Sequence, residues 1–453
     1  MLRERLNFIT IQINKLFEEL VNKYSKYTII LMILYKFSME LLYALVISPT
    51  YSYMGQVYEA VGWKYIISWV AYGYMIFILP KKEDGLKEVF LHIQIAVTFV
   101  PLIVFYALAN KSTIYLLMII LVISLEIHIL CKKQQSKIGI STKNIQPYVT
   151  VFMMIFILAV YLMILIYGGF YGLKAFDFEN VYKIRSSASY PLILEYIMGW
   201  LQFTIIPFFI LLFLEKKRYI IVLGLFVIML MMYMTLGNKY IYASLVVIIG
   251  GYIISHWKAL VVCVYAGLSI VNLLMTTLFL IEKPVGLTGV TSSLIGLVGD
   301  RFFFEPALNK YLYYECFSVF PKAGFADGII GRVFGLTYPY RGSMGQTAFA
   351  YLYNGRLFDS NSNTGYLGDS YGQAGFVGML ITGILLALFV KLLCDIGQNI
   401  GRVIMCPLLM LLGVLLNDSA FISIFLSSGW AILTLFLIIY AKPKGKIYKR
   451  SQL

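Results

Sequence analysis

Charged residues are scarce in this sequence. Asp, Glu, Lys and Arg together make up 13% of its 453 residues, about half of the roughly 25% that is usual in soluble domains. Hydrophobic residues make up 60%, so too little polar surface is available to cover a water-exposed fold of this size. The composition excludes a disordered chain and a conventional soluble enzyme, and it predicts a polytopic membrane protein.

Cysteine and histidine are also few, with five and three residues. Four cysteines fall in hydrophobic stretches or at their predicted inner ends, which leaves Cys316 as the one cysteine expected outside. A single outer thiol excludes an intramolecular disulfide on that face, and we expect it to react with a membrane-impermeant thiol reagent. No Cys/His spacing suits zinc. We therefore expect no disulfide scaffold, no metal site and no cofactor.

Long apolar stretches dominate what is present. A helix needs roughly 20 apolar residues to cross about 30 Å of hydrocarbon. The sequence predicts an all-α fold with about twelve transmembrane helices, at 28–48, 64–80, 88–110, 113–131, 148–168, 192–215, 218–236, 240–255, 259–281, 373–393, 403–416 and 419–441. The predicted organisation is an amphipathic interfacial helix at 1–27, nine helices in 28–281, an outer segment at 282–372, three helices in 373–441 and a basic tail at 442–453.

The net charge of +15 divides unevenly between the two predicted faces. With the N-terminus inside, the inner segments hold 22 basic and 8 acidic residues, a net of +14, and the outer segments hold 13 basic and 12 acidic residues, a net of +1. Lys and Arg favour cytoplasmic loops of membrane proteins. The partition predicts that both termini are cytoplasmic, and it makes a nucleic-acid partner unnecessary.

Two outer segments are unusually long, at 169–191 and at 282–372, the latter between helices 9 and 10. Loops of this length without a function are uncommon. The second begins with a helix-like stretch, Thr291–Phe320, broken by Pro306, which we expect to form short helices along the membrane surface. The Gly-rich, aromatic and polar stretch that follows suits either a sugar-binding surface or a re-entrant connector with turn glycines.

Charged residues near the outer face or inside spans are the first functional candidates. Arg185, Lys239 and Arg301 have no role in orientation, and cations on this face suit a diphosphate. The alternatives are lipid headgroups for Arg185, capping of a helix end for Lys239 and an ion pair with Glu305 for Arg301. Among charges inside spans, we expect Lys36 and Glu40 to pair at i, i+4, and we expect Glu126 and His128 to reach the inner interface.

Five blocks carry a family resemblance: SPTYSYMG from Ser48, YKIRSSASYPLILEYIMGW from Tyr182, TLGNK from Thr235, GDRFFFEPALNKYLYYECFS from Gly299 and NSNTGYLGDSYGQAGFVGML from Asn361. By these blocks and its hydropathy profile the chain resembles bacterial oligosaccharide repeat-unit polymerases, the O-antigen or capsule polymerases of the Wzy type. The resemblance implies a metal-independent, GT-C-like glycosyltransferase in the inner membrane, with its active site facing the periplasm. Its implied substrates are oligosaccharides linked to undecaprenyl diphosphate, and a separate co-polymerase is implied to set chain length.

The resemblance also implies roles for individual residues. Arg185, Lys239 and Arg301 would bind the diphosphate, and Asn363, Asp369 and Tyr371 would orient the acceptor glycan. The candidate general bases are Asp369, Glu305 and Asp300, in that order. For Asp369 the alternative is an ordinary helix N-cap before an apolar run.

Two other functions stay open at this stage. An O-antigen ligase-like glycosyltransferase is expected to use an outer-face histidine, whereas all three histidines of this chain lie near the predicted inner face. A polysaccharide flippase or other transporter is expected to show two similar halves, and the single large outer segment has no counterpart. Both comparisons favour the polymerase.

Overall fold

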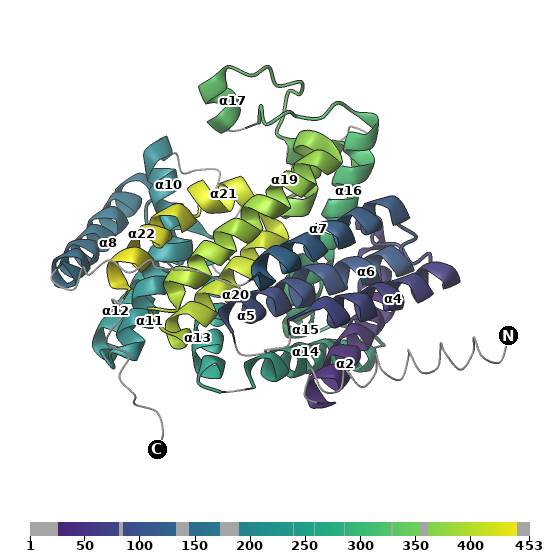
Figure 1. The fold of residues 1–453 in the computed structure, drawn as a ribbon, viewed down its shortest axis with the longest axis horizontal. Helices are drawn as coiled ribbons and strands as arrows, with labels where there is room; N and C mark the ends of the chain where they lie inside the picture. The colour runs from purple at the N-terminus through teal and green to yellow at the C-terminus, as the bar shows by residue number, and fades with distance from the viewer. Residues whose placement is uncertain are drawn as a thin grey trace. The chain divides into compact units, whose positions relative to one another are not determined.

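The computed structural model describes residues 26–80, 85–132, 145–172, 190–238, 240–257, 259–284, 286–327, 329–353 and 361–441. Every regular element within these ranges is a helix (Figure 1). Arg185 and Lys239, two of the three residues expected to bind a diphosphate, lie outside the described residues, as do the interfacial helix predicted at 1–27, up to residue 25, and the basic tail.

Eight helical stretches of the described chain are long and apolar enough to cross a membrane: Tyr27–Met54, Leu86–Leu108, Thr113–Cys131, Gln146–Gly168, Leu192–Glu215, Tyr219–Leu236, Leu260–Glu282 and Tyr366–Gly397. Two further apolar helices, Tyr240–Ser255 and Trp430–Tyr440, are shorter. The chain therefore has the all-helical, apolar character of a polytopic membrane protein. Twelve spans and their orientation stay predictions.

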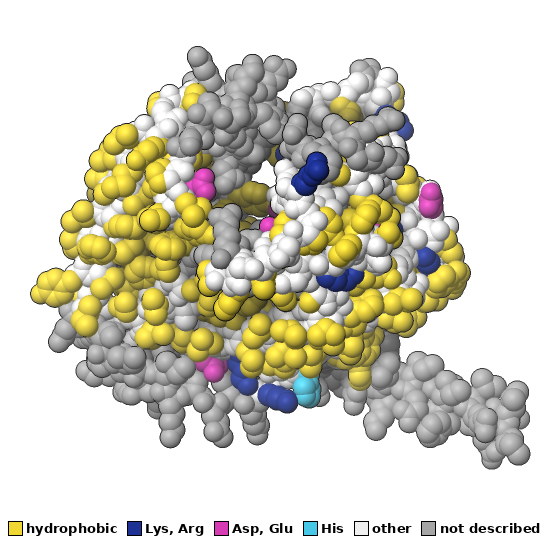
Figure 2. Space-filling view, turned by 90° about the horizontal axis from the view of Figure 1, so that it is seen from above, with side chains coloured by type: hydrophobic (Ala, Val, Ile, Leu, Met, Phe, Trp, Pro, Cys, Tyr) yellow, Lys and Arg dark blue, Asp and Glu magenta, His cyan; other side chains and the backbone are white. Residues whose placement is uncertain are grey.

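Hydrophobic side chains cover much of the surface. Figure 2 shows one face on which yellow hydrophobic side chains are far more numerous than charged ones. Large apolar residues such as Val70, Ile166 and Ile220 are exposed over most of their area. Exposed apolar surface of this extent is unfavourable in water and suits contact with lipid.

The chain divides into two compact units, of which unit 1 comprises residues 1–131, 259–387 and 416–420. Its described helical segments are α2 (Lys26–Leu42), η1 (Tyr43–Ile47), α3 (Ser48–Tyr51), η2 (Ser52–Met54), α4 (Gly62–Ile78), α5 (Leu86–Gln94), η3 (Ile95–Phe99), α6 (Val100–Leu108), α7 (Thr113–Cys131), α14 (Leu260–Glu282), α15 (Gly289–Leu294), η6 (Ile295–Phe304), α16 (Glu305–Val319), α17 (Ile329–Phe334), α18 (Met344–Leu352) and most of α19 (Tyr366–Gly397). Every residue of η3 and α6 is buried, so this stretch forms the centre of unit 1.

Unit 2 comprises residues 132–258, 388–415 and 421–453. Its helical segments are α8 (Gln146–Gly168), α10 (Leu192–Trp200), η5 (Leu201–Ile205), α11 (Ile206–Glu215), α12 (Tyr219–Leu236), α13 (Tyr240–Ser255), the rest of α19, α20 (Arg402–Asp418) up to residue 415, α21 (Phe421–Leu426) and α22 (Trp430–Tyr440). Packed rings form part of its core, with Phe208 stacked on Phe436 and edge-on to Tyr440.

The single helix predicted at 419–441 is wrong, because α21 and α22 are separate. The chain turns at Ser427–Gly429, where Gly429 has a φ of +81° that favours glycine. The indole nitrogen of Trp200 donates a hydrogen bond to the carbonyl of Leu426 at 2.7 Å. This contact satisfies a carbonyl that the broken helix leaves without its usual partner.

The segment 282–372 holds two short helices, α17 and α18, but its stretch Thr291–Phe320 is not broken into short surface helices. From Gly289 to Val319 the chain is continuously helical through α15, η6 and α16. Pro306 does not break the helix, because it occupies the first turn of α16 directly after the π-helical η6, where its missing N–H is tolerated. Ten of the fifteen residues of α16 are buried, so α16 packs inside unit 1 and does not lie on its surface.

α19 is two helices joined by a sharp turn. Ala374 and Gly375 have non-helical dihedral angles, and Gly375 has a φ of +64°. The Tyr366 hydroxyl donates to Glu126 at 3.2 Å, and a Cβ on Gly383 would lie 3.1 Å from the other oxygen of Glu126. Seventeen residues of straight helix would separate these two positions by about 25 Å. Residues 361–373, here called the fold-back segment, therefore turn back along the rest of α19.

Candidate functional site

The π-helical η6 shapes the backbone around Asp300 and Arg301. Its wider turn is maintained to the end, where the amide of Glu305 donates to the carbonyl of Asp300. Because Pro306 has no N–H, the carbonyl of Phe302 lacks its helical donor. The side-chain amide of Asn417 donates to this carbonyl at 2.9 Å instead. π-helical segments often occur at functional sites.

Asp300, which belongs to η6, has a buried side chain. It is 3% exposed, and its carboxylate accepts a hydrogen bond from the side-chain nitrogen of Gln56, which is fully buried. Burial raises the pKa of Asp300 to about 7, and the charge of Glu305 adds to the rise, whereas the Gln56 hydrogen bond and the Arg301 charge oppose it. The contact joins the residue directly after the first sequence block to the block that begins at Gly299.

Arg301 lies at the exposed rim of the same cluster. Burial raises the pKa of Glu305, and the nearby Arg301 guanidinium partly opposes the rise. Tyr51 approaches from the first block, since a Cβ on Gly296 would lie 3.2 Å from its hydroxyl. We call Tyr51, Gln56, Asp300, Arg301 and Glu305 the Arg301 cluster: an exposed cation beside two carboxyl groups that retain protons above their ordinary pH range.

A line of asparagines continues from this cluster. Asn309 follows Glu305 by one turn of α16, and its amide donates to the carbonyl of Asn363 at 2.7 Å. The side chain of Asn363 is exposed and accepts a hydrogen bond from Asn361 at 2.9 Å. Asn361 in turn accepts one from the hydroxyl of Ser343 at 3.1 Å. The exposed side chains of Asn361 and Asn363 can therefore offer polar groups to a ligand.

Lys310 is a functional candidate that the sequence did not single out. It is fully buried, and its ammonium donates to the backbone and side-chain oxygens of Asn417 at 2.6 and 2.9 Å and to the carbonyl of Pro306 at 3.1 Å. Burial lowers its pKa to about 7. The three donors of the ammonium are matched by three neutral acceptors, so Lys310 fixes the end of α20 against α16.

No contact among the described residues joins Asp369 or Tyr371 of the fold-back segment to the Arg301 cluster. Asp369 lies in the first turn of α19, three residues after its start, so it is not the N-cap. It is hydrogen-bonded to Gln373 and lies near Asp327. The Tyr371 ring is 6% exposed, packs on Tyr115 and has the Lys322 ammonium 4.3 Å from its centre. It therefore presents no open face to a sugar.

A groove opens between α2, η1 and α4, with a volume of about 370 Å³. It is lined by Phe37, Glu40, Leu41, Ala44, Tyr58, Ala60, Val61, Gly62, Tyr65 and Leu108. One lining residue, Tyr58, follows Gln56 of the Arg301 cluster by two residues in the sequence. Most of the lining is apolar, which suits a hydrocarbon tail.

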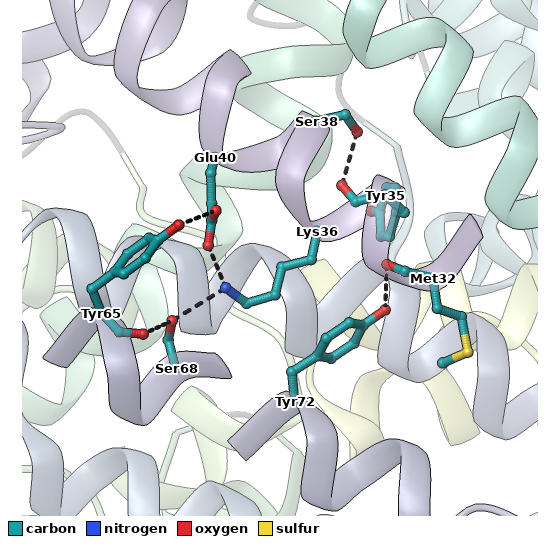
Figure 3. A network of polar contacts seen from close by, with 8 residues as sticks. All are labelled: Met32, Tyr35, Lys36, Ser38, Glu40, Tyr65, Ser68 and Tyr72. Atoms are coloured by element: carbon teal, nitrogen blue, oxygen red, sulfur yellow. Dashed lines mark hydrogen bonds and ion pairs between the residues drawn. The ribbon is translucent and has the colours of Figure 1, made fainter. Parts of the chain in front are cut away.

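The polar base of this groove contains the predicted ion pair of Lys36 and Glu40, which the structure confirms (Figure 3). The hydroxyl of Tyr65 donates to Glu40 at 3.0 Å, and the Lys36 ammonium donates to Ser68 at 3.2 Å. The same ammonium lies 3.8 Å from the centre of the Trp69 ring. All polar atoms of the pair have partners, so the pair is a stable part of the wall.

Two expectations about buried groups are wrong. Glu126 does not reach an interface, since it is 1% exposed and hydrogen-bonded to Gln94 and Tyr366, whereas His128 is exposed. Cys316 is fully buried, and burial raises the pKa of its thiol to about 12. A buried thiol that is not ionised does not react with an impermeant reagent.

The described part of the chain holds no group of three or more His, Cys, Asp or Glu side chains placed to hold a metal ion. What the Arg301 cluster offers is an exposed guanidinium beside two carboxyl groups with raised pKa values. No protein-family model, no curated protein and no solved structure matches this chain.

Proposed function

We propose that this protein is a surface-polysaccharide polymerase, which transfers a growing glycan from undecaprenyl diphosphate onto the non-reducing end of a new lipid-linked repeat unit. The observation that carries the proposal is the grouping of Arg301 with the partly buried Glu305 and the buried Asp300. The transfer needs a cation for the leaving diphosphate and a base for the acceptor hydroxyl.

In this proposal Arg301 binds the diphosphate oxygens in a bidentate manner. The acceptor hydroxyl attacks the anomeric carbon of the donor glycan, and the bond from that carbon to the diphosphate oxygen breaks. The lipid diphosphate leaves with the electron pair of the broken bond. Glu305, which is partly exposed and has a raised pKa, takes the proton of the hydroxyl. Glu305 thus ranks ahead of Asp369 as the base.

The asparagines and the groove support the same proposal. Asn361 and Asn363 are exposed and supply polar contacts for an acceptor, and the buried Asn309 holds the Asn363 carbonyl one helical turn from Glu305. The groove lined by Phe37 and Leu41 supplies apolar surface for a prenyl tail. Asp300 is too buried to contact an acceptor and supports the backbone beside Arg301.

The experiment is reconstitution of the purified full chain in liposomes with lipid-diphosphate-linked repeat units, followed by separation of the glycans by size. The wild type is expected to give a ladder. Arg301→Ala and Glu305→Gln are each expected to reduce the rate at least about 100-fold, the usual scale for losing a general base or a charge-stabilising group. Arg218→Ala, which removes an exposed arginine in unit 2, is the matched control and should keep the ladder.

Other outcomes would refute the proposal. Movement of intact lipid-linked units between leaflets without any ladder would indicate a flippase. Transfer of preformed polymer to a lipid A-core acceptor, without extension, would indicate a ligase. Full ladders from both Arg301→Ala and Glu305→Gln would show that the Arg301 cluster is not the active site.

A further inference from the structure

Three polar side chains from three helices meet deep inside unit 1. The side-chain nitrogen of Gln94 in α5 donates to Glu126 in α7 and to the hydroxyl of Tyr366 in α19, both at 2.6 Å. The Tyr366 hydroxyl also donates to Glu126 at 3.2 Å. Each of the three residues is at most 1% exposed. The proposed transfer reaction uses none of them.

Such a group is costly unless its hydrogen bonds are made. Burying an unpaired amide, hydroxyl or carboxyl group is strongly unfavourable, so each member depends on the other two. Gln94 ends a run of buried residues in α5, Val89–Gln94, and Glu126 lies on the buried face of α7. Tyr366 is different, because it belongs to the fold-back segment, whose path is set by the turn at Ala374 and Gly375.

The helix before the turn at Ala374 and Gly375, here called the first arm, and the helix after it, the second arm, both lie against the carboxyl group of Glu126. Tyr366 contacts one oxygen of Glu126, and the second arm passes its other oxygen at Gly383. A Cβ on Gly383 would also lie 2.6 Å from Val122, so the second arm is held tightly against α7. The first arm contacts the same carboxyl group through the Tyr366 hydroxyl.

How deep the first arm lies inside unit 1 determines the position of Asn363. Tyr366 follows Asn363 by three residues, and the carbonyl of Asn363 is held by Asn309, one helical turn from Glu305. The start of the segment is close-packed as well, because a Cβ on Gly365 would lie 2.4 Å from the carbonyl oxygen of Leu416. A shift of Tyr366 would therefore move Asn363 relative to Glu305.

We propose that Glu126 is a positioning residue that, with Gln94, holds Tyr366 and thereby sets the depth of the fold-back segment and the place of Asn363 beside Glu305. The positioning itself is independent of the reaction. Its consequence for acceptor binding rests on the proposed function.

Hydrogen–deuterium exchange of the full chain in lipid nanodiscs tests the positioning directly. Tyr366→Phe removes the hydroxyl and keeps the ring, and it takes one hydrogen bond each from Glu126 and Gln94, which stay bonded to each other. Exchange of the backbone amides of residues 366–373 is expected to rise about tenfold, the scale of one lost buried hydrogen bond, while α14 stays unchanged. Glu126→Leu should give the same result, and Glu126→Gln, which keeps an acceptor, should stay close to wild type.

Tyr115→Phe is the matched control. Tyr115 is a fully buried tyrosine on the same helix as Glu126, and its hydroxyl makes no hydrogen bond within the described residues. Its loss should leave exchange of residues 366–373 unchanged. The proposal is overturned if Tyr366→Phe exchanges like wild type, or if Tyr115→Phe accelerates exchange as much as Tyr366→Phe does.

The glycan ladder then separates this inference from the proposed function. Tyr366→Phe and Glu126→Leu are expected to slow polymerisation about tenfold, with the rate restored in Glu126→Gln. Faster exchange with an unchanged rate would overturn the link to Asn363. A wild type that makes no ladder would refute the proposed function, whereas the exchange result would still decide whether Glu126 positions the segment.

Discussion

The side chain of Gln56 donates a hydrogen bond to the carboxylate of Asp300, 244 residues further along the chain. The contact joins the turn after the first long helix to the π-helical η6. It also gives a buried carboxyl group a neutral partner in place of a cation. The ionisation of Asp300 should therefore affect the stability of the fold.

Asp300→Asn should stabilise the protein at pH 8 relative to wild type and have a smaller effect at pH 5. The folded-state pKa of Asp300, about 7, lies above its ordinary value of 3.8. The folded state therefore binds the proton more tightly, and this contribution is complete below about pH 4 and is lost as the pH rises to about 7. At pH 8 the cost is at most about 4 kcal/mol. Thermal unfolding in detergent at both pH values measures it, and equal shifts at both would contradict the assignment.

Arg301→Gln should move the acid limb of the pH–rate profile to higher pH. The Arg301 charge opposes the rise in the pKa of Glu305 that burial causes, so its loss raises that pKa further. A general base acts only when ionised, so activity falls at a higher pH than in wild type. Arg301→Lys keeps the charge and should leave the limb in place. A profile that does not move in Arg301→Gln would show that Glu305 is not the base.

Lys310→Met should lower the free energy of unfolding by about 2–4 kcal/mol, because it leaves the two buried oxygens of Asn417 without the Lys310 ammonium as their donor. Denaturation in mixed detergent measures the change. Lys283→Met, at an exposed lysine beyond the end of α14, should change it by less than about 0.5 kcal/mol. Similar values for the two variants would mean that the Lys310 contacts contribute nothing net.

Cys316 should not react with an impermeant maleimide from either side of the membrane while the protein is folded, because its thiol is fully buried and has a raised pKa. Cys131 is exposed and, with the orientation that the charge partition predicts, should react only in permeabilised vesicles. Mass spectrometry of labelled peptides checks both. Labelling of Cys131 in sealed right-side-out vesicles would reverse the predicted orientation.

The helices could be predicted well from the sequence, because hydropathy over about 20 residues decides where an apolar helix forms. Local pairs could be predicted too, as Lys36 and Glu40 show. Pro306 was misjudged because its effect depends on the π-helical turn before it and on a donor from Asn417. No local pattern contains that information.

The candidate site was predicted in part. Asp300, Arg301 and Glu305 lie within one block, so their proximity follows from helical spacing. Their partner Gln56 and the burial of Tyr371 depend on contacts between segments far apart in the chain. The direction of the fold-back segment depends on the backbone dihedral angles of Ala374 and Gly375. These two residues lie in an apolar run that predicts a continuous helix, so the turn could not be predicted from the sequence.

The turn at Ala374 and Gly375 also has a consequence for the order in which the protein is built. Tyr366 requires Gln94 and Glu126, which are synthesised some 240–270 residues earlier, and the start of the segment packs against Leu416 and Asn417, which are synthesised later. Contacts with such long sequence separation form late in folding. The helices can therefore insert one after another, whereas the asparagines beside Glu305 reach their places only after nearly the whole chain has left the ribosome.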